Sequence, residues 1–361
     1  MTKRIKLFDP YVSKEEVSAT RKVLESKFWA SGAGTGKVLE FENKFNNYIE
    51  SDYCVALSNG TAALHLALSL FDLENKEVIV PSLSFVSTAH AVVYNQAKPI
   101  FVDVDPNTLC IDPKMVKEAI TEKTIIILPV HFGGMPCDLN TLSILSQTHG
   151  IVLVEDAAHA VGTSYQGKKI GSSSTACCFS FHPVKNLAMP TGGAITLNGK
   201  KSAIFNSVLR SRRWCGISHR IGAKYDITDL GWNYYMNEFS AAIGIEQLKK
   251  LDKMNSKRTK IARRYSKEID AEVKMPFNKE CSYHLYWIQV KNRDRFMKKM
   301  QDNDIETGIH YLPIHKMAFY KGRLKLPITE AAAKKIVSIP LHSNLYEDDI
   351  NKIIKTVNRF S

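Results

Sequence analysis

Short apolar runs alternate with amphipathic stretches along the first two-thirds of the chain. Six apolar runs rich in Val, Ile, Leu or Phe are bounded by polar or turn residues, which is typical of buried strands: 53–57, 77–80, 100–104, 124–130, 151–155 and 177–181. Helix-like segments separate them, for example over 62–71 and from Pro113 and Asn140 onward. Strands that alternate with helices predict a largely parallel sheet covered on both faces.

The stretch from Cys177 to Gly193, CCFSFHPVKNLAMPTGG, combines a buried strand with a candidate reactive group. The strand breaks at Pro183, and Lys185 follows on a loop. A lysine held where a buried strand opens into a loop can be desolvated, which favours its neutral, nucleophilic form. The run ending at Asp156 delivers a carboxylate at the end of another strand, and ligands gather at such strand ends in parallel sheets.

Asp156, Ser180 and Lys185 together are the groups that a pyridoxal phosphate (PLP) site needs. The lysine forms a Schiff base with the cofactor, and the aspartate pairs with the protonated pyridine nitrogen so that the ring stays an electron sink. The serine hydroxyl can donate to the phosphate. The sequence therefore predicts a PLP enzyme with Lys185 as its catalytic residue.

A second segment has the pattern of a phosphate-binding turn. The run at 53–57 leads into Ser58-Asn59-Gly60-Thr61 and then into a helix, so free backbone N–H groups and the positive end of the helix dipole face the same point. The earlier glycine-rich segment 32–37 is not a P-loop, because Lys37 is followed by Val38 instead of Ser or Thr. We expect a flexible loop there.

The segments Asp156-Ala-Ala-His159 and Ser180-Phe-His-Pro-Val-Lys185-Asn resemble the DegT/DnrJ/EryC1/StrS family of sugar aminotransferases, a branch of the fold-type I PLP enzymes. The resemblance extends over nearly the whole chain. It implies a large α/β domain of the aspartate aminotransferase type, residues 1–250, with a mostly parallel seven-stranded sheet. A small C-terminal α+β domain, residues 251–361, would follow.

The resemblance also implies roles for further residues. Gly60, Thr61 and Ala62 match the segment that grips the cofactor phosphate, and Phe85 matches the aromatic that stacks on the pyridine, although a core role is the alternative. His159 would hydrogen-bond Asp156 or the ring hydroxyl. The resemblance further implies that Asn233 of one subunit reaches the cofactor phosphate bound by the neighbouring subunit. It also implies that His310 and His315 belong to a loop on the substrate side of the site. For His131 a structural role is nearly as good an interpretation.

Two segments depart from the family pattern. Tyr235 stands where the family usually has arginine, so another residue must fill the role of that arginine or the role is absent in this chain. The segment Met189-Pro-Thr-Gly-Gly193 lacks a glutamate that the family often has, which affects loop shape and substrate contacts but not the lysine.

The formal charge of +13 permits an anionic substrate, nucleic acid or a membrane surface. No RRM signature or aromatic–basic interleaving supports nucleic acid, and no apolar run reaches the roughly 20 residues of a membrane span. Seven scattered cysteines without a CxxC pair, and histidines without ligand spacing, predict no metal site. The start of the chain has no signal-peptide pattern, so we expect a cytoplasmic protein.

The resemblance implies a homodimer with shared active sites that moves an amino group from an amino acid, glutamate by expectation, to a nucleotide-linked keto sugar. The cofactor would pass through pyridoxamine phosphate (PMP). Five cations in a short stretch could hold a diphosphate: Arg210, Arg212, Arg213, Arg220 and Lys224. We expect Arg212 and Arg213 in particular to bind substrate. Alternatives are a cyclitol or free keto sugar as acceptor, or a dehydratase or regulator of the same family; the dehydratases carry histidine in place of the lysine.

Overall fold

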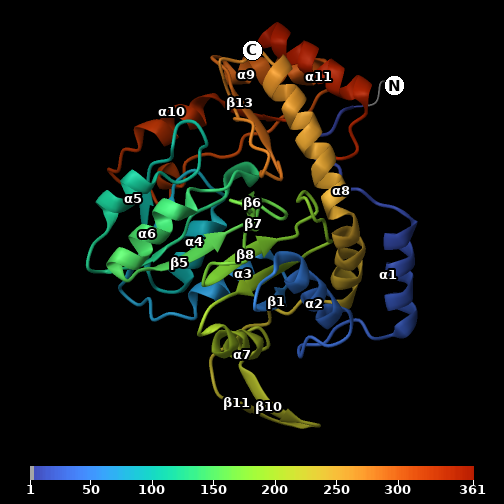
Figure 1. Ribbon diagram of the computed structural model, residues 1–361, viewed down its shortest axis with the longest axis vertical. Coiled ribbons are helices and arrows are strands. Elements are labelled where there is room, and N and C mark those ends of the chain that lie inside the picture. Colours follow the sequence, from blue (N-terminus) through green and yellow to red (C-terminus); the bar gives the residue numbers. More distant parts are fainter. Residues whose placement is uncertain (1–3) are drawn as a thin grey trace.

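A seven-stranded sheet forms the centre of the computed structural model, which describes residues 4–361 (Figure 1). Its strand order is β1-β9-β8-β5-β4-β2-β3, and only β9 runs antiparallel to its neighbours. The strands are β1 (Tyr53–Leu57), β2 (Glu77–Pro81), β3 (Lys98–Val102), β4 (Thr124–Ile127), β5 (Val152–Asp156), β8 (Ala176–Ser180) and β9 (Gly193–Leu197). The predicted fold class, a mostly parallel seven-stranded sheet in an α/β domain, is confirmed.

Both faces of this sheet are buried, as the continuous apolar runs predict. Successive residues of one strand belong to different cores: Val78 and Val80 pack in one core and Ile79 in the other. Helices α3 (Gly60–Leu68), α4 (Ser87–Tyr94) and α7 (Ser202–Arg212) contribute to the core that contains Val78. The other core is covered by α2 (Lys37–Ile49), α5 (Pro113–Ala119), α6 (Leu139–His149) and part of α8 (Glu238–Glu268).

The small domain is an α+β unit at the end of the molecule that carries the C-terminus (Figure 1). Its three-stranded antiparallel sheet consists of β12 (Val273–Lys274), β13 (Tyr286–Gln289) and β14 (Ile336–Ile339). Its helices are α9 (Arg293–Asp302), α10 (Pro327–Lys335) and α11 (Glu347–Phe360). Ile5 forms a parallel bridge with Ile305, so the beginning of the described chain pairs with this domain and not with the large one.

Helix α8 runs without interruption for 31 residues from the large domain into the small one. The predicted boundary at residue 250 therefore lies inside a helix. Asn237 caps the start of this helix by accepting a hydrogen bond from the Ser240 N–H at 2.8 Å. Helix α1 (Lys14–Ser26) packs along the first half of α8.

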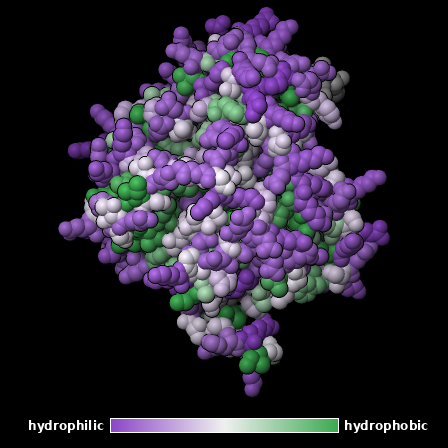
Figure 2. All heavy atoms as spheres, viewed as in Figure 1, coloured by the Kyte–Doolittle hydropathy of each residue, from purple (hydrophilic) through white to green (hydrophobic). Residues whose placement is uncertain are grey.

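Two short strand pairs and two 3₁₀ turns complete the description of the fold. The β6–β7 ribbon (Ser164–Tyr165 and Lys168–Lys169) and the 3₁₀ turns η1 (Phe132–Gly134) and η2 (Ile314–Lys316) lie on loops. The hairpin of β10 (Ile217–Ile221) and β11 (Lys224–Ile227) projects from the body, and Ile221 is 82% exposed at its end (Figure 1). The face shown in Figure 2 is mainly hydrophilic. Within residues 4–361 no helix combines the length and apolarity needed to cross a bilayer.

Candidate active site

The carboxyl ends of the central strands bring the predicted site residues together. Asp156 is the last residue of β5, Ser180 is the last residue of β8, and Lys185 follows five residues later. Strands β5 and β8 are parallel neighbours, with Asp156 opposite Cys178. The topology therefore delivers the carboxylate and the amine to the same edge of the sheet, where ligands of α/β folds bind.

Lys185 presents an amine without a partner. Within residues 4–361 its Nζ forms no hydrogen bond or ion pair with another group, and the side chain is half-buried. Burial lowers the pKa of Lys185 to about 8, while the nearby Asp156 carboxylate opposes this shift. Roughly one-tenth of the amine is therefore neutral at pH 7, far more than for a lysine with an ordinary pKa, and the neutral form is the one that attacks a carbonyl.

Asp156 is buried, and both of its oxygens are held by the protein. Oδ1 accepts a hydrogen bond from the Ala158 N–H at 3.1 Å, and Oδ2 accepts one from the Thr88 hydroxyl at 2.8 Å. Burial raises the pKa of Asp156, whereas these two donors and the charge of Lys185 lower it. The carboxylate is thus fixed in orientation before any ligand arrives.

The turn after β1 has the shape of a phosphate cradle. A Cβ added to Gly60 would lie 2.7 Å from Cβ of Ser180, so only glycine leaves this space between the turn and the serine open. The first-turn N–H groups of α3 have no acceptor within the helix, but the Ala62 N–H already donates to the Asn59 side chain at 2.9 Å. The hydroxyl of Thr61 lies 2.7 Å from that of Ser87.

His159 is buried and neutral. Its Nδ1 accepts a hydrogen bond from the Gly133 N–H at 3.2 Å, which assigns the proton to Nε2. Nε2 lies 3.1 Å from the Tyr311 hydroxyl, to which it therefore donates. Burial, and secondarily the charge of Lys185, holds the pKa of His159 well below its usual range. The ring of His284 lies 4.5 Å from that of His159, and burial lowers the pKa of His310 to about 4.

Phe85 presents its ring to solvent at this edge of the sheet. The side chain is 57% exposed, and its centroid lies 6.0 Å from that of Tyr311. A core phenylalanine would be buried, so the core alternative is excluded and the ring is available for stacking. The role of stacking on a cofactor stays a prediction.

The other predicted histidines have partners within the chain. His131 is fully buried, with Nε2 2.7 Å from Glu155 Oε2 and Nδ1 accepting from the Cys137 N–H, so it has the contacts of a structural residue. His315 is buried as well, with Nδ1 2.6 Å from the Ser82 hydroxyl and Nε2 3.2 Å from Glu330. His310 bonds the Ser338 hydroxyl through Nδ1 at 2.9 Å.

The arginines expected to bind substrate are engaged in ion pairs. Arg213 is fully buried and paired with Glu42, and its guanidinium also bonds the backbone oxygens of Ala56 and Ala33. Arg210 shares the same Glu42 carboxylate at 2.9 Å. Arg212 pairs with Asp229. Arg210 and Arg213 therefore join the C-terminal end of α7 to α2 and β1, whereas Arg212 contacts Asp229 and Ser69. A substrate role for Arg212 and Arg213 stays a prediction.

Asn233 lies exposed on this protomer. Its backbone bridges Trp214, and two residues later Tyr235 bridges Leu57 at the end of β1. Tyr235 therefore takes a structural place beside the phosphate cradle. The Met189 side chain is buried against Gly192 and against Gly244 of α8, which shows how this chain fills the loop that departs from the family pattern.

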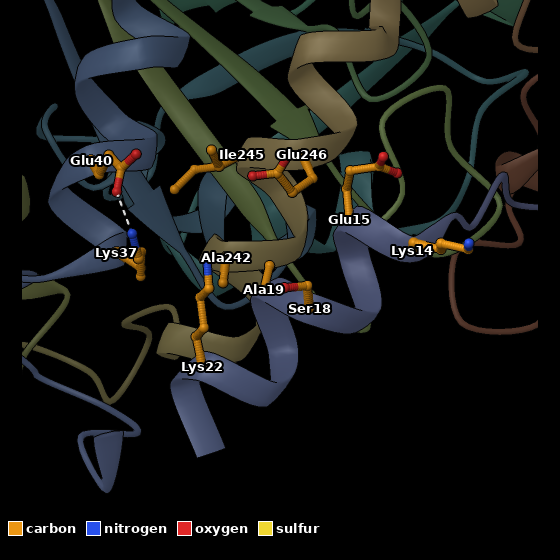
Figure 3. Close-up of a pocket in the computed structure, with 10 residues that line it drawn as sticks. All are labelled: Lys14, Glu15, Ser18, Ala19, Lys22, Lys37, Glu40, Ala242, Ile245 and Glu246. Atoms are coloured by element: carbon orange, nitrogen blue, oxygen red, sulfur yellow. Dashed lines mark hydrogen bonds and ion pairs between the residues drawn. The ribbon is translucent and has the colours of Figure 1, made fainter. Parts of the chain in front are cut away.

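A separate pocket of about 370 Å³ lies between α1, α2 and α8 (Figure 3). Its charges balance locally, since Lys37 pairs with Glu40 at 2.7 Å. Lys37 also begins α2, whose first N–H groups donate to Glu238. A carboxylate of the chain itself thus occupies the end of this helix, in agreement with the rejection of a P-loop. No group of three or more metal-binding side chains was found among residues 4–361.

The residues present fit PLP. The unpartnered Lys185 amine, the oriented Asp156 carboxylate, the open cradle at Gly60 and the exposed Phe85 ring offer one group for each part of that cofactor. Sequence reasoning missed Thr88 and Tyr311, which contact Asp156 and His159. The sequence signal for Thr88 was its position three residues after Phe85, at the start of a helix. The sequence signal for Tyr311 was its place in the motif His310-Tyr-Leu-Pro-Ile-His315.

Comparison with known proteins gives a consistent result. The model of the DegT/DnrJ/EryC1/StrS aminotransferase family matches residues 10–358. The uncharacterized protein MJ1066 of Methanocaldococcus jannaschii is 32% identical, with 98% of this chain and 96% of that protein covered.

Two solved structures superpose over almost the full length. The sugar aminotransferase CalS13 from Micromonospora echinospora is 29% identical with a TM-score of 0.90, covering 98% of this chain and 99% of that one. DesV from S. venezuelae, in complex with a ketimine intermediate, is 31% identical with a TM-score of 0.89, covering 96% and 94%.

Fold and site together define a PLP-dependent transferase of the aspartate aminotransferase type. The chain belongs to the DegT/DnrJ/EryC1/StrS aminotransferase family. Its cofactor is PLP, which supplies an electron sink for exchanging an amino group and a carbonyl.

Proposed function

We propose that the protein transfers the amino group of glutamate to a keto sugar carried on a nucleotide. The observation that carries this proposal is the unpartnered amine of Lys185 beside the Asp156 carboxylate, with a phosphate cradle at Gly60. Similarity to CalS13, a sugar aminotransferase by name, supports a sugar as acceptor.

In this proposal each residue of the site has one task. Lys185 holds the cofactor and, when released, accepts and returns a proton through Nζ. Asp156 holds the proton on the ring nitrogen, Phe85 covers one face of the ring, and Ser180 with the turn at Gly60 binds the phosphate. His159 donates through Nε2 to Tyr311, which leaves the tyrosine hydroxyl able to donate to a ligand.

The lysine favours an aminotransferase over the alternatives. The dehydratases that the family resemblance suggests carry histidine at this position, whereas this chain has Lys185 with a lowered pKa. A regulator would need the cofactor but not a reactive amine. A cyclitol or free keto sugar as acceptor remains the second candidate, because nothing in the Lys185 site itself requires a nucleotide.

Two cations could hold the diphosphate of a nucleotide-linked sugar. Arg210, Arg212 and Arg213 are already paired with carboxylates, whereas Arg220 and Lys224 on the projecting hairpin form no ion pair within residues 4–361. Each charge-assisted contact to a phosphate contributes roughly 1.5–3 kcal/mol. Of the five cations, Arg220 and Lys224 on the hairpin are therefore the two that support binding of a nucleotide diphosphate.

We therefore expect a nucleoside diphosphate alone to inhibit competitively against the keto sugar substrate, and added salt to weaken that inhibition. Replacing both hairpin cations, Arg220→Gln with Lys224→Gln, should weaken inhibition by at least about tenfold. Lys168→Gln with Lys321→Gln changes the net charge equally and serves as the control. Equal turnover of a free keto sugar or cyclitol, without inhibition by any nucleoside diphosphate, would contradict the nucleotide assignment.

The exposed position of Asn233 supports a site shared between two protomers. If Asn233 acts on the neighbouring cofactor, a mixed dimer of Lys185→Ala and Asn233→Ala chains has one site with both residues intact. We expect each single variant to be inactive and the mixture to recover up to about a quarter of wild-type activity, since random mixing makes half of the dimers mixed and each has one intact site of two. Mixtures that stay inactive while forming dimers would show that Asn233 acts within its own chain.

A further inference from the structure

The first turn of α4 touches both ends of the candidate cofactor site. Ser87 places its hydroxyl 2.7 Å from that of Thr61 in the phosphate cradle. The next residue, Thr88, donates its hydroxyl to Asp156 Oδ2 at 2.8 Å. Two residues before Ser87, the exposed ring of Phe85 begins this segment. The segment from Phe85 to Thr88 therefore contacts or contains the groups proposed to bind the phosphate, the ring nitrogen and the ring face of the cofactor.

Thr88 belongs to a buried, directional chain of hydroxyl groups. Thr88 is 1% exposed and Ser84 is 2% exposed, and their hydroxyl oxygens lie 2.8 Å apart. Because the single proton of the Thr88 hydroxyl goes to the carboxylate, its oxygen must accept from Ser84. The order is thus Ser84 to Thr88 to Asp156, and every donor in it points toward the carboxylate.

We propose that Thr88, oriented by Ser84, is a positioning residue that keeps the Asp156 carboxylate ionised and aimed at the ring nitrogen of the cofactor. This inference rests on the part of the proposed function that makes Asp156 the ring partner, and it is independent of which sugar is the acceptor. Without the hydroxyl, Oδ2 would be buried without that donor, which favours the neutral acid.

The direction of the effect follows from the surroundings of Asp156. Burial raises its pKa, and the Thr88 hydroxyl is one of the groups that oppose this. The other titratable groups that interact electrostatically with Asp156 are the following: Lys185, His131, Tyr311, Cys177 and Cys178. The substitution Thr88→Val replaces none of these titratable groups, so the lost hydroxyl is the change made next to Asp156. An activity that needs the carboxylate is present above its pKa and lost as the pH falls through it, so removing the donor moves the loss to higher pH.

The test compares holoenzyme variants Thr88→Val and Thr88→Ser through reactions that need no sugar. We expect Thr88→Val to shift the acid limb of the glutamate half-reaction upward by about one pH unit and to weaken PLP binding by about tenfold. Thr88→Ser, which keeps the hydroxyl, should restore both. The pH titration of the visible spectrum of the bound cofactor, recorded without substrate, should move in parallel.

Thr329→Val is the matched control, because the Thr329 hydroxyl also donates to a buried carboxylate, that of Asp103, at 2.6 Å. It should lower stability without moving the pH profile or the spectrum. If Thr88→Val fails to fold, Ser84→Ala tests the same chain of hydroxyl groups and should give a smaller shift in the same direction. The inference would be overturned if the pH profile of Thr88→Val superposed on that of the wild type while Asp156→Asn was impaired. If Thr88→Val does not fold, the same criterion applies to the pH profile of Ser84→Ala. A normal Asp156→Asn enzyme would instead overturn the proposed role of Asp156.

Discussion

Replacing Lys185 by alanine is expected to reduce amino transfer on the order of 10⁴-fold, because the variant loses both the covalent anchor of the cofactor and the group that moves the proton. In the wild type, borohydride reduction followed by peptide mapping should place a pyridoxyl group on Lys185. Since the neutral amine attacks and its pKa is about 8, attachment to the apoenzyme should accelerate with pH and level off above that value.

The Lys185→Ala variant should keep its fold. The amine makes no hydrogen bond within the described chain, so we expect the melting temperature to stay within about 2 °C of wild type. Lys169→Ala is the control, because Lys169 Nζ bonds the Tyr48 backbone oxygen at 2.6 Å and its loss should affect stability but not transfer. A pyridoxyl group on any other lysine would refute the central assignment.

The second large effect is expected for Asp156→Asn, which should still bind PLP but slow the proton transfer on the order of 10³-fold. The amide keeps the size of the side chain but removes the anion that holds the ring nitrogen protonated. Single-turnover kinetics with glutamate measure the step directly. Asp103→Asn changes another buried carboxylate that binds a threonine hydroxyl, and it should leave this rate unchanged. Near-normal turnover of Asp156→Asn would mean that another group is the ring partner.

The sheet and its central residues were predictable because the signals are local. Each parallel strand is a continuous apolar run, and Asp156 and Lys185 stand where two such runs end. Once the strands are parallel, their carboxyl ends share one edge of the sheet, so both side chains were expected at that edge. The structure adds that β5 and β8 are neighbours, which brings the two side chains close together. The strand, glycine-bearing turn and helix around Gly60 also indicated a phosphate-binding turn, a pattern that is weak by itself, and the family resemblance assigned this turn to the cofactor phosphate.

The contacts that orient the site could not be predicted in the same way. Thr88 reaches Asp156 across 68 positions of sequence, and Tyr311 reaches His159 across 152, so neither pair leaves a periodic pattern. The β10–β11 hairpin was missed for another reason. Its strands are largely exposed on the protomer, so they lack the alternation of apolar and polar positions that half-burial imposes.

The continuity of α8 restricts how the two domains can move. A helix of 31 residues is about 46 Å long, and sharp bends in helices need a proline, an inserted side chain or water, or a similar defect. This helix contains no proline, and its Gly244 is packed tightly against Met189. The helix therefore crosses the domain boundary without a bending point, and we expect no clamshell closure of the two domains about residue 250.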